Sequence, residues 1–167
     1  IEERVLFTFD GKQQVTYLKG IDSLFTKVNP IEKTLFNGQW LAANTNQVVV
    51  GYGISQKFSM GVLDFNRLLE VFVPKPGKGA IENPEQAFNQ SDLLPIGIYT
   101  VNEDLDSKYV FADLGLAQEL LAYQPNQVSG LEIKTQQGAN EKAIIEQLQT
   151  IYKNTITVKN RAQLNES

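Results

Sequence analysis

Residues 108–135 constrain the fold more than any other part of the sequence, because they read as a strand, a helix and a second strand in succession. Residues 109–111 form a short run of β-forming residues, and Asp113 stands where a helix N-cap would. The apolar residues that follow at helical spacing are Leu116, Ala117, Leu120 and Leu121. Pro125 ends this helix, and residues 128–134 read as the second strand. Strands joined by a crossover helix usually lie parallel in one sheet, so the stretch predicts a domain that mixes helices with strands.

A second unit of the same kind overlaps the first. The strand at 128–134 is followed by an amphipathic helix over 141–152 and by a closing strand over 155–158. Near the start of the chain, residues 4–9 and 14–19 flank Asp10-Gly11, which predicts a β-hairpin with a two-residue turn.

The middle of the chain contains weaker signals. Residues 48–50, 68–73 and 96–101 read as strands, and a short helical stretch runs from Tyr52 to Phe58. Residues 29–46 are interpreted as a loop with apolar anchors, and residues 102–107 as an acidic turn. Residues 74–95 form either a long loop or an extended hairpin, because they contain several prolines and glycines and few apolar residues. Long loops in compact domains are more often functional than plain connectors.

The composition excludes several classes of function. The chain has 167 residues, a formal net charge of −4, and no cysteine or histidine. It therefore has no thiolate nucleophile, no histidine base and none of the usual zinc ligand sets. Its Lys and Arg residues are scattered singly, so we expect no nucleic acid partner.

Three short motifs resemble binding sites but lack a required residue. Gly51-Tyr52-Gly53 begins like a dinucleotide-binding fingerprint, but Gln56 takes the place of its third glycine. Residues 76–79 lack the Ser or Thr that follows the lysine of a phosphate loop. Residues 104–106 carry alternating carboxylates, but a calcium loop would need Gly and Glu where Tyr109 and Gly115 stand. We predict no catalytic residue, no metal and no cofactor.

A stand-alone enzyme that uses buried carboxylates remains an alternative. Aspartates and glutamates far apart in the sequence can meet in space, and the sequence does not favour any pair. An apolar cleft with two converging carboxylates would support this alternative.

The sequence has no segment long and apolar enough to span a membrane, since the longest apolar or glycine run is near residues 48–54. It begins Ile1-Glu2-Glu3, and its only methionine is Met60. We interpret the chain as a piece of a longer protein, whose own membrane segments this sequence would not show.

Taken in order, these segments resemble the extracytoplasmic core domain of FtsX/MacB-class ABC transporter permeases, most closely those of the lipoprotein-releasing (Lol) type. The similarity runs almost end to end. It is carried by ERVLFTFDGKQQVTYLKGID near the start, GQW at 38–40, VVVGYGISQKFSMGVLD from Val48, VFVPKPGKG from Val71, LLPIGIYTVNEDLDSKYVFADLGLAQELL from Leu93, VSGLEIKT from Val128 and ITVKNRAQLNES at the end.

The resemblance implies an α+β fold with two lobes within one periplasmic core domain, residues 1–167. Residues 1–20 together with 128–167 would form a membrane-proximal strand-helix-strand lobe, built from both chain ends. Residues 21–127 would form a mainly β inserted lobe. The family's first strand and helix after the membrane are missing from this sequence.

The resemblance also implies a non-catalytic role. The domain would lie in the periplasm as part of an inner-membrane protein, between transmembrane helices of the same parent chain. A cytoplasmic ATPase subunit and a second permease subunit would be its partners, and it would couple ATP hydrolysis to lipoprotein release or to handover to a periplasmic carrier. The alternatives are a MacB-like export permease that docks a membrane-fusion adaptor, and an FtsX-like activator of a cell-wall hydrolase.

In the Lol-type permeases, one paralogue holds the lipoprotein carrier with a long proline-containing hairpin, and residues 74–95 resemble that hairpin by position. The expected partner-binding residues are Pro74, Lys75, Pro76, Lys78, Ile81, Pro84 and Phe88. The resemblance is positional only, because the stretch has two lysines but no arginine and few apolar residues. A surface loop that merely connects two strands is the alternative for the same residues.

Overall fold

The computed structural model describes residues 1–75, 87–153, 155–160 and 163. The chain divides into two compact units, Ile1–Glu132 and Ile133–Ser167. Both helices and strands are present, so the predicted α+β class is confirmed. Among the described residues, no helix is both long and apolar enough to cross a membrane.

The first unit holds all the strands of the described chain. They are β1 (Glu2–Phe9), β2 (Lys12–Ile21), β3 (Leu35–Gly38), β4 (Gln47–Gly51), β5 (Leu69–Pro74), β6 (Phe88–Tyr99) and β7 (Tyr109–Asp113). Its helices are short: α1 (Phe25–Val28), the 3₁₀ helix η1 (Ile31–Thr34), α2 (Tyr52–Phe58), α3 (Glu103–Asp106) and α4 (Leu114–Leu120). The second unit contains α5 (Glu141–Ile151).

The hairpin predicted at the start of the chain is confirmed. β1 and β2 are antiparallel, with Phe9 paired to Lys12 across the turn. Asp10 and Gly11 both have positive φ, of 50° and 77°. This is the pattern of a type I′ turn, whose twist matches that of the two strands. The turn fixes the register, and the register decides which side chains face the core.

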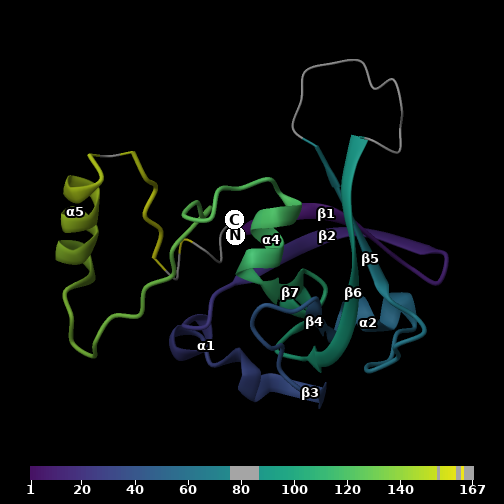
Figure 1. Ribbon diagram of the computed structural model, residues 1–167. Helices are drawn as coiled ribbons and strands as arrows, with labels where there is room; N and C mark the ends of the chain where they lie inside the picture. The colour runs from purple at the N-terminus through teal and green to yellow at the C-terminus, as the bar shows by residue number, and fades with distance from the viewer. Residues whose placement is uncertain (76–86, 154, 161–162, 164–167) are drawn as a thin grey trace. The chain divides into compact units, whose positions relative to one another are not determined.

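The sheet closes on itself. Its strand order is β3-β6-β4-β7-β2-β1-β5, and β5 pairs back with β6, so that all strands except β3 form a ring (Figure 1). β2 runs parallel to β7, and β4 runs parallel to β6, while the remaining pairs are antiparallel. Closure leaves no free edge along most of the sheet.

β6 makes this closure possible because its two halves have different neighbours. Residues 88–93 pair with β5, and residues 94–99 pair with β4. A β-bulge between Val48 and Val49 lies opposite Pro95, a residue that cannot donate a ladder hydrogen bond. The described ends of β5 and β6 extend together away from the body of the sheet (Figure 1).

Apolar side chains fill the inside of the ring. Alternate residues of β1 and β5 point inward, as in Val5, Phe7 and Phe9. α4 covers this core with Ala117 and Leu120. A second cluster on the outer side of β7 consists of Ile21, Val49, Tyr99 and Phe111, against which Phe25, Ile31, Leu35, Trp40, Leu41 and Tyr109 pack.

Two helix predictions are confirmed by their caps. The Asp113 side chain accepts a hydrogen bond from the Gly115 N–H at 2.9 Å and caps α4. Asn140 caps α5 in the same way, by accepting from Ala143 N–H at 3.2 Å. The strand at 48–50 and the helix from Tyr52 to Phe58 are also confirmed.

The strands predicted at 128–134 and 155–158 are wrong. Neither segment pairs with a neighbouring strand among the described residues, and a strand without a partner leaves its backbone groups unpaired. The loop expected at 29–46 contains η1 and the edge strand β3. The acidic turn at 102–107 is the short helix α3, capped by Asn102.

The predicted membrane-proximal lobe combines the start of the chain with residues of the second unit. The grouping of residues 1–20 with 128–167, and of residues 21–127 as an insertion, therefore stays a prediction.

Tyr99 joins the core to the α3 region, and its replacement gives a first testable prediction. Its hydroxyl donates to the Leu105 carbonyl at 2.8 Å and lies 3.1 Å from the Tyr109 carbonyl. Tyr99→Phe should therefore lower the free energy of unfolding by about 1–2 kcal/mol at pH 7, because a buried hydrogen bond is lost. Urea unfolding measures this change, and Tyr52→Phe, an exposed tyrosine, is the control.

The same variant should alter the alkaline limit of stability. Burial, reinforced by the charge of Asp106, raises the pKa of Tyr99 well above its usual value. The stabilising contribution of the neutral hydroxyl is complete below the unfolded-state pKa of about 10 and is lost as pH rises toward the folded-state value. Stability should fall less steeply above pH 10 in Tyr99→Phe than in the unmodified chain. Equal slopes would contradict this assignment.

Candidate protein-docking site

The arms of the β5–β6 hairpin carry the described part of the predicted partner-binding segment. Pro74 pairs with Phe88 across the two arms, and the Lys75 N–H donates to the Ala87 carbonyl at 2.8 Å. Residues 74–75 and 87–93 therefore lie on two paired arms, as in the extended hairpin that was one of the two structures predicted for 74–95. Pro74, Lys75 and Phe88 are all exposed, as a docking role requires.

The other expected partner-binding residues lie outside the described residues. These are Pro76, Lys78, Ile81 and Pro84. A role for any of the seven residues in partner binding stays a prediction.

A polar contact fixes the arm of β6 to α4. The Asn89 side-chain amide donates to the Leu120 carbonyl at 2.8 Å, at the end of α4. Since Asn89 and Phe88 are adjacent in a strand, they face opposite sides of the sheet. The contact that anchors the arm therefore leaves Phe88 facing outward.

Strand register connects Phe88 to further apolar residues on the outer face of the sheet. Phe72, two residues before Pro74, pairs with Leu6 of β1, and Leu6 pairs with Val15 of β2. Leu6 and Phe72 are half-buried, and Val15 is 54% exposed. We call this set the outer stripe, defined as Phe88, Pro74, Phe72, Leu6 and Val15.

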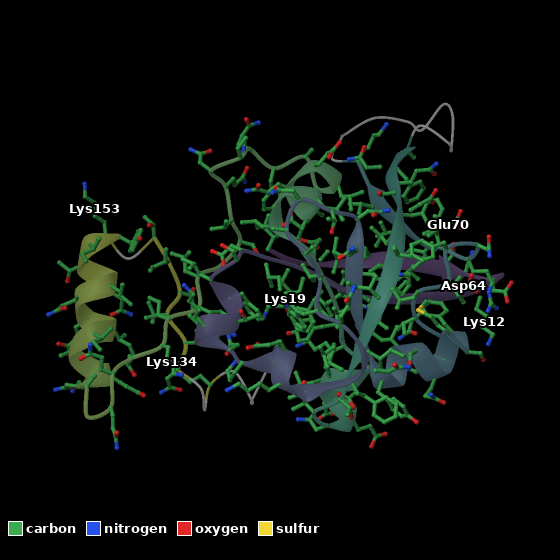
Figure 2. The ribbon with its side chains drawn as sticks, turned by 60° about the horizontal axis from the view of Figure 1, so that its bottom comes forward. Lys12, Lys19, Asp64, Glu70, Lys134 and Lys153 are labelled. Atoms are coloured by element: carbon green, nitrogen blue, oxygen red, sulfur yellow. The ribbon has the colours of Figure 1, made fainter. Side chains whose placement is uncertain are left out.

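Polar and charged side chains line one border of the outer stripe. Glu70 pairs with Asp92 on one side and with Thr8 on the other, and the Thr8 hydroxyl donates to the Glu70 carboxylate at 2.5 Å. Figure 2 shows Glu70 among the side chains of this part of the molecule. Since Glu70 and Phe72 lie two residues apart in β5, both face outward.

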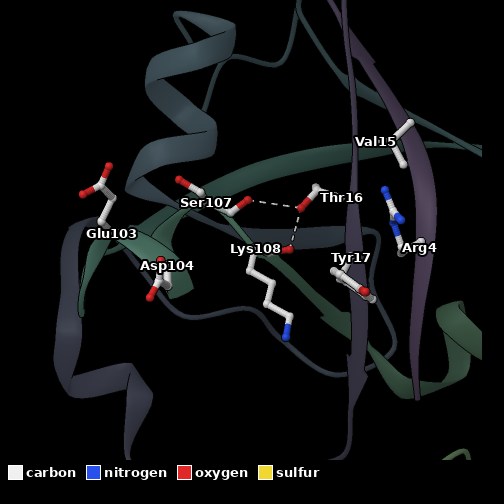
Figure 3. A pocket seen from close by; sticks show the side chains of 8 residues that line it. All are labelled: Arg4, Val15, Thr16, Tyr17, Glu103, Asp104, Ser107 and Lys108. Carbon is white, nitrogen blue, oxygen red and sulfur yellow. Dashed lines mark hydrogen bonds between the residues drawn. The ribbon is translucent and has the colours of Figure 1, made fainter. Parts of the chain in front are cut away.

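A shallow, open groove lies at the Val15 end of the outer stripe (Figure 3). Its volume is about 500 Å³, and it is lined by Arg4, Val15, Thr16, Tyr17, Glu103, Asp104, Ser107 and Lys108. The Thr16 hydroxyl lies 2.6 Å from the Lys108 carbonyl and 3.2 Å from that of Ser107, which ties β2 to the wall of the groove. The Lys108 ammonium stands over the rings of Tyr17 and Tyr109 at 5.2 and 5.1 Å.

An apolar stripe bordered by charges matches the anatomy of a protein interface. Such interfaces have an apolar centre depleted in charge and a polar rim that stays accessible to water. Here the centre is the outer stripe, and the rim includes Glu70, Asp92 and Arg4.

The buried carboxylates are occupied by local hydrogen bonds. Asp106 accepts from the Thr100 hydroxyl and from the Val101 N–H, both at 2.7 Å, and Asp113 caps α4. The acidic stretch 102–107 thus buries one of its carboxylates, because the Asp106 side chain is buried and holds the end of β6 against α3. The two glycines of the GxGxxG-like motif are also structural, because a side chain at Gly51 or Gly53 would clash with the Asp106 backbone or the Ser107 side chain.

Sequence reasoning missed Leu6, Val15 and Phe72. The first two could have been found, because the Asp10-Gly11 turn fixes their pairing and both lie on the face opposite Val5 and Phe7. Phe72 gave no such signal, because its pairing with Leu6 joins residues far apart in the sequence.

No protein-family model matches the sequence, and no curated protein matches it either. Among solved structures, the periplasmic region of MacB from Actinobacillus actinomycetemcomitans matches with a TM-score of 0.54 and 13% sequence identity, over 92% of this chain. The chain shares the fold of the MacB periplasmic region.

The chain is shorter than the proteins that it matches. It spans 63% of the MacB periplasmic region. A second structure, the extracellular domain of the noncanonic ABC-type transporter YknZ from Gram-positive bacteria, matches with a TM-score of 0.49 and 10% identity, over 71% of this chain and 54% of its own length. At such low identities, the similarity to MacB establishes the fold and not the activity.

Proposed function

We propose that this chain is a non-catalytic periplasmic domain of an ABC transporter permease in the inner membrane. The observation that carries the proposal is the fold shared with the MacB periplasmic region over 92% of the chain. In this proposal, transmembrane helices of the same parent chain connect the domain to the membrane. A cytoplasmic ATPase subunit and a second permease subunit complete the transporter.

The proposed task of the domain is to bind a protein in the periplasm and to change that binding when the membrane helices move. The outer stripe supports this task, because it offers an apolar surface that continues from the arms of the β5–β6 hairpin onto β1 and β2. β-Strand surfaces held by a closed sheet are rigid, so the stripe can transmit a displacement of the sheet to a bound protein. No residue of this site needs to react chemically.

We propose a lipoprotein carrier, or a lipoprotein itself, as the bound protein. The extended hairpin supports this choice, because it stands where the Lol-type resemblance places a carrier-binding element and because Pro74 and Phe88 are exposed on it. The domain would then couple ATP hydrolysis to lipoprotein release or to handover.

A second candidate is export with a membrane-fusion adaptor as the docked protein. The similarity to the MacB periplasmic region favours this candidate. Both candidates use the same fold and a docking surface, and they differ in the protein that the surface binds.

Affinity purification of the full-length parent from native membranes tests the transporter assignment. An ABC ATPase subunit should copurify with the parent in mild detergent, and ATP hydrolysis in the purified complex should be lost when the phosphate-binding lysine of that ATPase is replaced. A parent that purifies without any ATPase, under conditions that preserve other membrane complexes, would contradict the assignment.

A further inference from the structure

After α4 the chain continues through turns and without regular secondary structure, and it contacts the β1–β2 hairpin at Glu2 and Lys19. The Gln118 side-chain amide first holds this segment by donating to the Pro125 and Gln127 carbonyls, both at 3.0 Å. The Ser129 hydroxyl then accepts from the Glu2 N–H at 3.0 Å. Glu132, the last residue of the first unit, makes the final contact.

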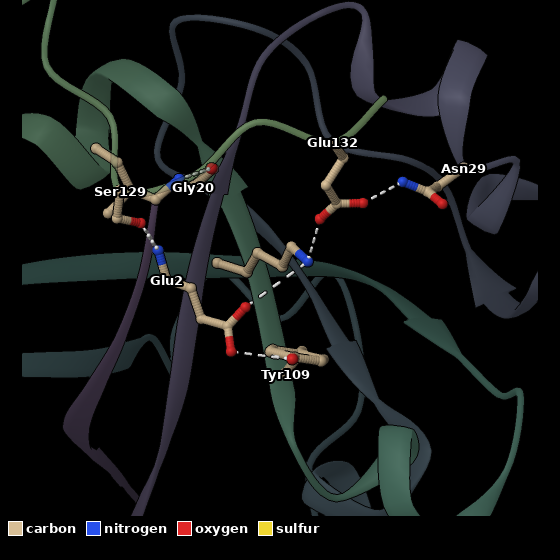
Figure 4. A network of polar contacts seen from close by, with 8 residues as sticks. Glu2, Gly20, Asn29, Tyr109, Ser129 and Glu132 are labelled. Carbon is tan, nitrogen blue, oxygen red and sulfur yellow. Dashed lines mark hydrogen bonds and ion pairs between the residues drawn. The ribbon is translucent and has the colours of Figure 1, made fainter. Parts of the chain in front are cut away.

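Two donors hold the Glu132 carboxylate, one at each oxygen (Figure 4). The Lys19 ammonium lies 2.6 Å from one oxygen, and the Asn29 side-chain amide donates to the other. Lys19 comes from β2, and Asn29 follows α1, so the carboxylate joins two elements that precede it by about a hundred residues.

The Lys19 site does not depend on Glu132 for its arrangement. The ammonium also lies 3.8 Å from the Glu2 carboxylate, and it stands over the rings of Tyr109 and Phe25 at 5.0 and 5.4 Å. The Tyr109 hydroxyl donates to Glu2 at 3.0 Å and holds that carboxylate in place. Lys19 would thus keep its position and a charge partner if Glu132 left.

Apolar burial contributes little to holding residues 128–132. Val128 and Leu131 are 41% and 71% exposed, so the segment is held to the sheet by its polar contacts. Ion pairs and hydrogen bonds at the surface are individually weak, and salt screens the ion pair. Segments with such contacts open more often than the core does.

We propose that residues 128–132 form a strap that detaches from the sheet while the sheet stays folded. With the strap attached, the connection to the second unit starts after Glu132. With the strap detached, it starts after Gln127 and is longer by roughly 17 Å, the extended length of five residues. Attachment and detachment of the strap therefore change the length of the connection between the two units. This proposal does not depend on the chain being part of a transporter.

Hydrogen exchange on the full 167-residue chain tests the strap. The reporter is the Glu2 amide, because it donates to the Ser129 hydroxyl of the strap. In the unmodified chain, this amide should exchange faster than the amides of the buried strand β4. Lys19→Gln and Glu132→Gln should each speed the exchange of the Glu2 amide by about fivefold, the effect of losing one weak charged contact, and leave β4 unchanged. Lys19→Arg should restore most of the protection, and raised salt should act in the same direction as Lys19→Gln.

Glu3→Gln is the matched control, because Glu3 is an exposed glutamate of β1 beside the strap contacts. It should leave the exchange of the Glu2 amide unchanged. Two results would overturn the proposal. One is unchanged exchange of the Glu2 amide in both Lys19→Gln and Glu132→Gln. The other is exchange of the Glu2 amide only at the rate of β4, which would mean that the strap opens only when the whole unit unfolds.

Discussion

Phe111→Ala is expected to lower the free energy of unfolding by about 3–5 kcal/mol, the usual loss when a buried phenylalanine is truncated. Phe111 is 2% exposed and lies on β7, in the middle of the sheet. Its ring packs against four others, with centroid distances of 5.2 Å to Tyr99, 5.7 Å to Phe25 and Trp40, and 6.0 Å to Tyr109. Truncation would leave a cavity bounded by rings that cannot collapse into it.

Chemical unfolding of the isolated chain, followed by the fluorescence of its single tryptophan, measures this loss. Phe36→Ala is the matched control, because Phe36 is 62% exposed on the edge strand β3. Its ring meets that of Tyr52 at a centroid distance of 5.2 Å, so its replacement should change stability by at most about 1 kcal/mol. A loss below about 1 kcal/mol for Phe111→Ala would show that the aromatic cluster does not hold α1 and the β3 region to the sheet.

Phe88→Ala in the full-length parent should weaken binding of the docked protein by about thirtyfold or more, as expected for an aromatic residue at the centre of an interface. Phe88 is 39% exposed and begins the described arm of β6, opposite Pro74. Since the side chain points outward, its loss should leave the fold intact. The measurement is the affinity of the purified parent for the protein that it captures.

Phe36→Ala is also the control for the binding measurement, because Phe36 lies far from Phe88 along β6. Phe36 is a more exposed phenylalanine, but it lies on β3, which pairs with the opposite end of β6 from Phe88. Phe36→Ala should leave the affinity unchanged. Equal losses for the two variants would mean that binding depends on general surface hydrophobicity and not on the outer stripe.

The sequence predicted the elements whose stabilising contacts join residues close together in the chain. The Asp10-Gly11 turn needs two positive φ values, which this pair supplies easily, and the hairpin followed from it. The helix α4 followed from Asp113 and the apolar spacing behind it, and α5 followed from its amphipathic pattern. In each case the residues that make the element lie within one or two turns of each other.

Elements that depend on distant partners were missed. Residues 89–92, Asn-Gln-Ser-Asp, are polar and read as a loop, yet they form a strand because β5 pairs with them. β3 exists because Gly38 and Gly97 let two backbones approach closely, where a side chain on either would clash. Conversely, residues 128–134 have the alternation of a strand but meet no free edge among the described residues.

The candidate site also has a part that the sequence could predict and a part that depends on contacts between distant residues. The exposed arms with Pro74 and Phe88 were expected, and the pairing of Leu6 with Val15 could have been read from the turn. The continuity of the outer stripe depends on Phe72 lying beside Leu6, and only the closed sheet brings these two together.

Photocrosslinking in cells tests the central claim most directly, which is that a periplasmic protein docks on the outer stripe of a transporter domain. Photoreactive side chains would replace Val15, Phe88 and, as the control, Phe36 in the full-length parent. Val15 and Phe88 should capture the same protein and Phe36 should not, and the identity of that protein would distinguish a lipoprotein carrier from an adaptor. Capture from Phe36 alone, or no adduct from both stripe positions while the parent is present at its normal level, would contradict the account.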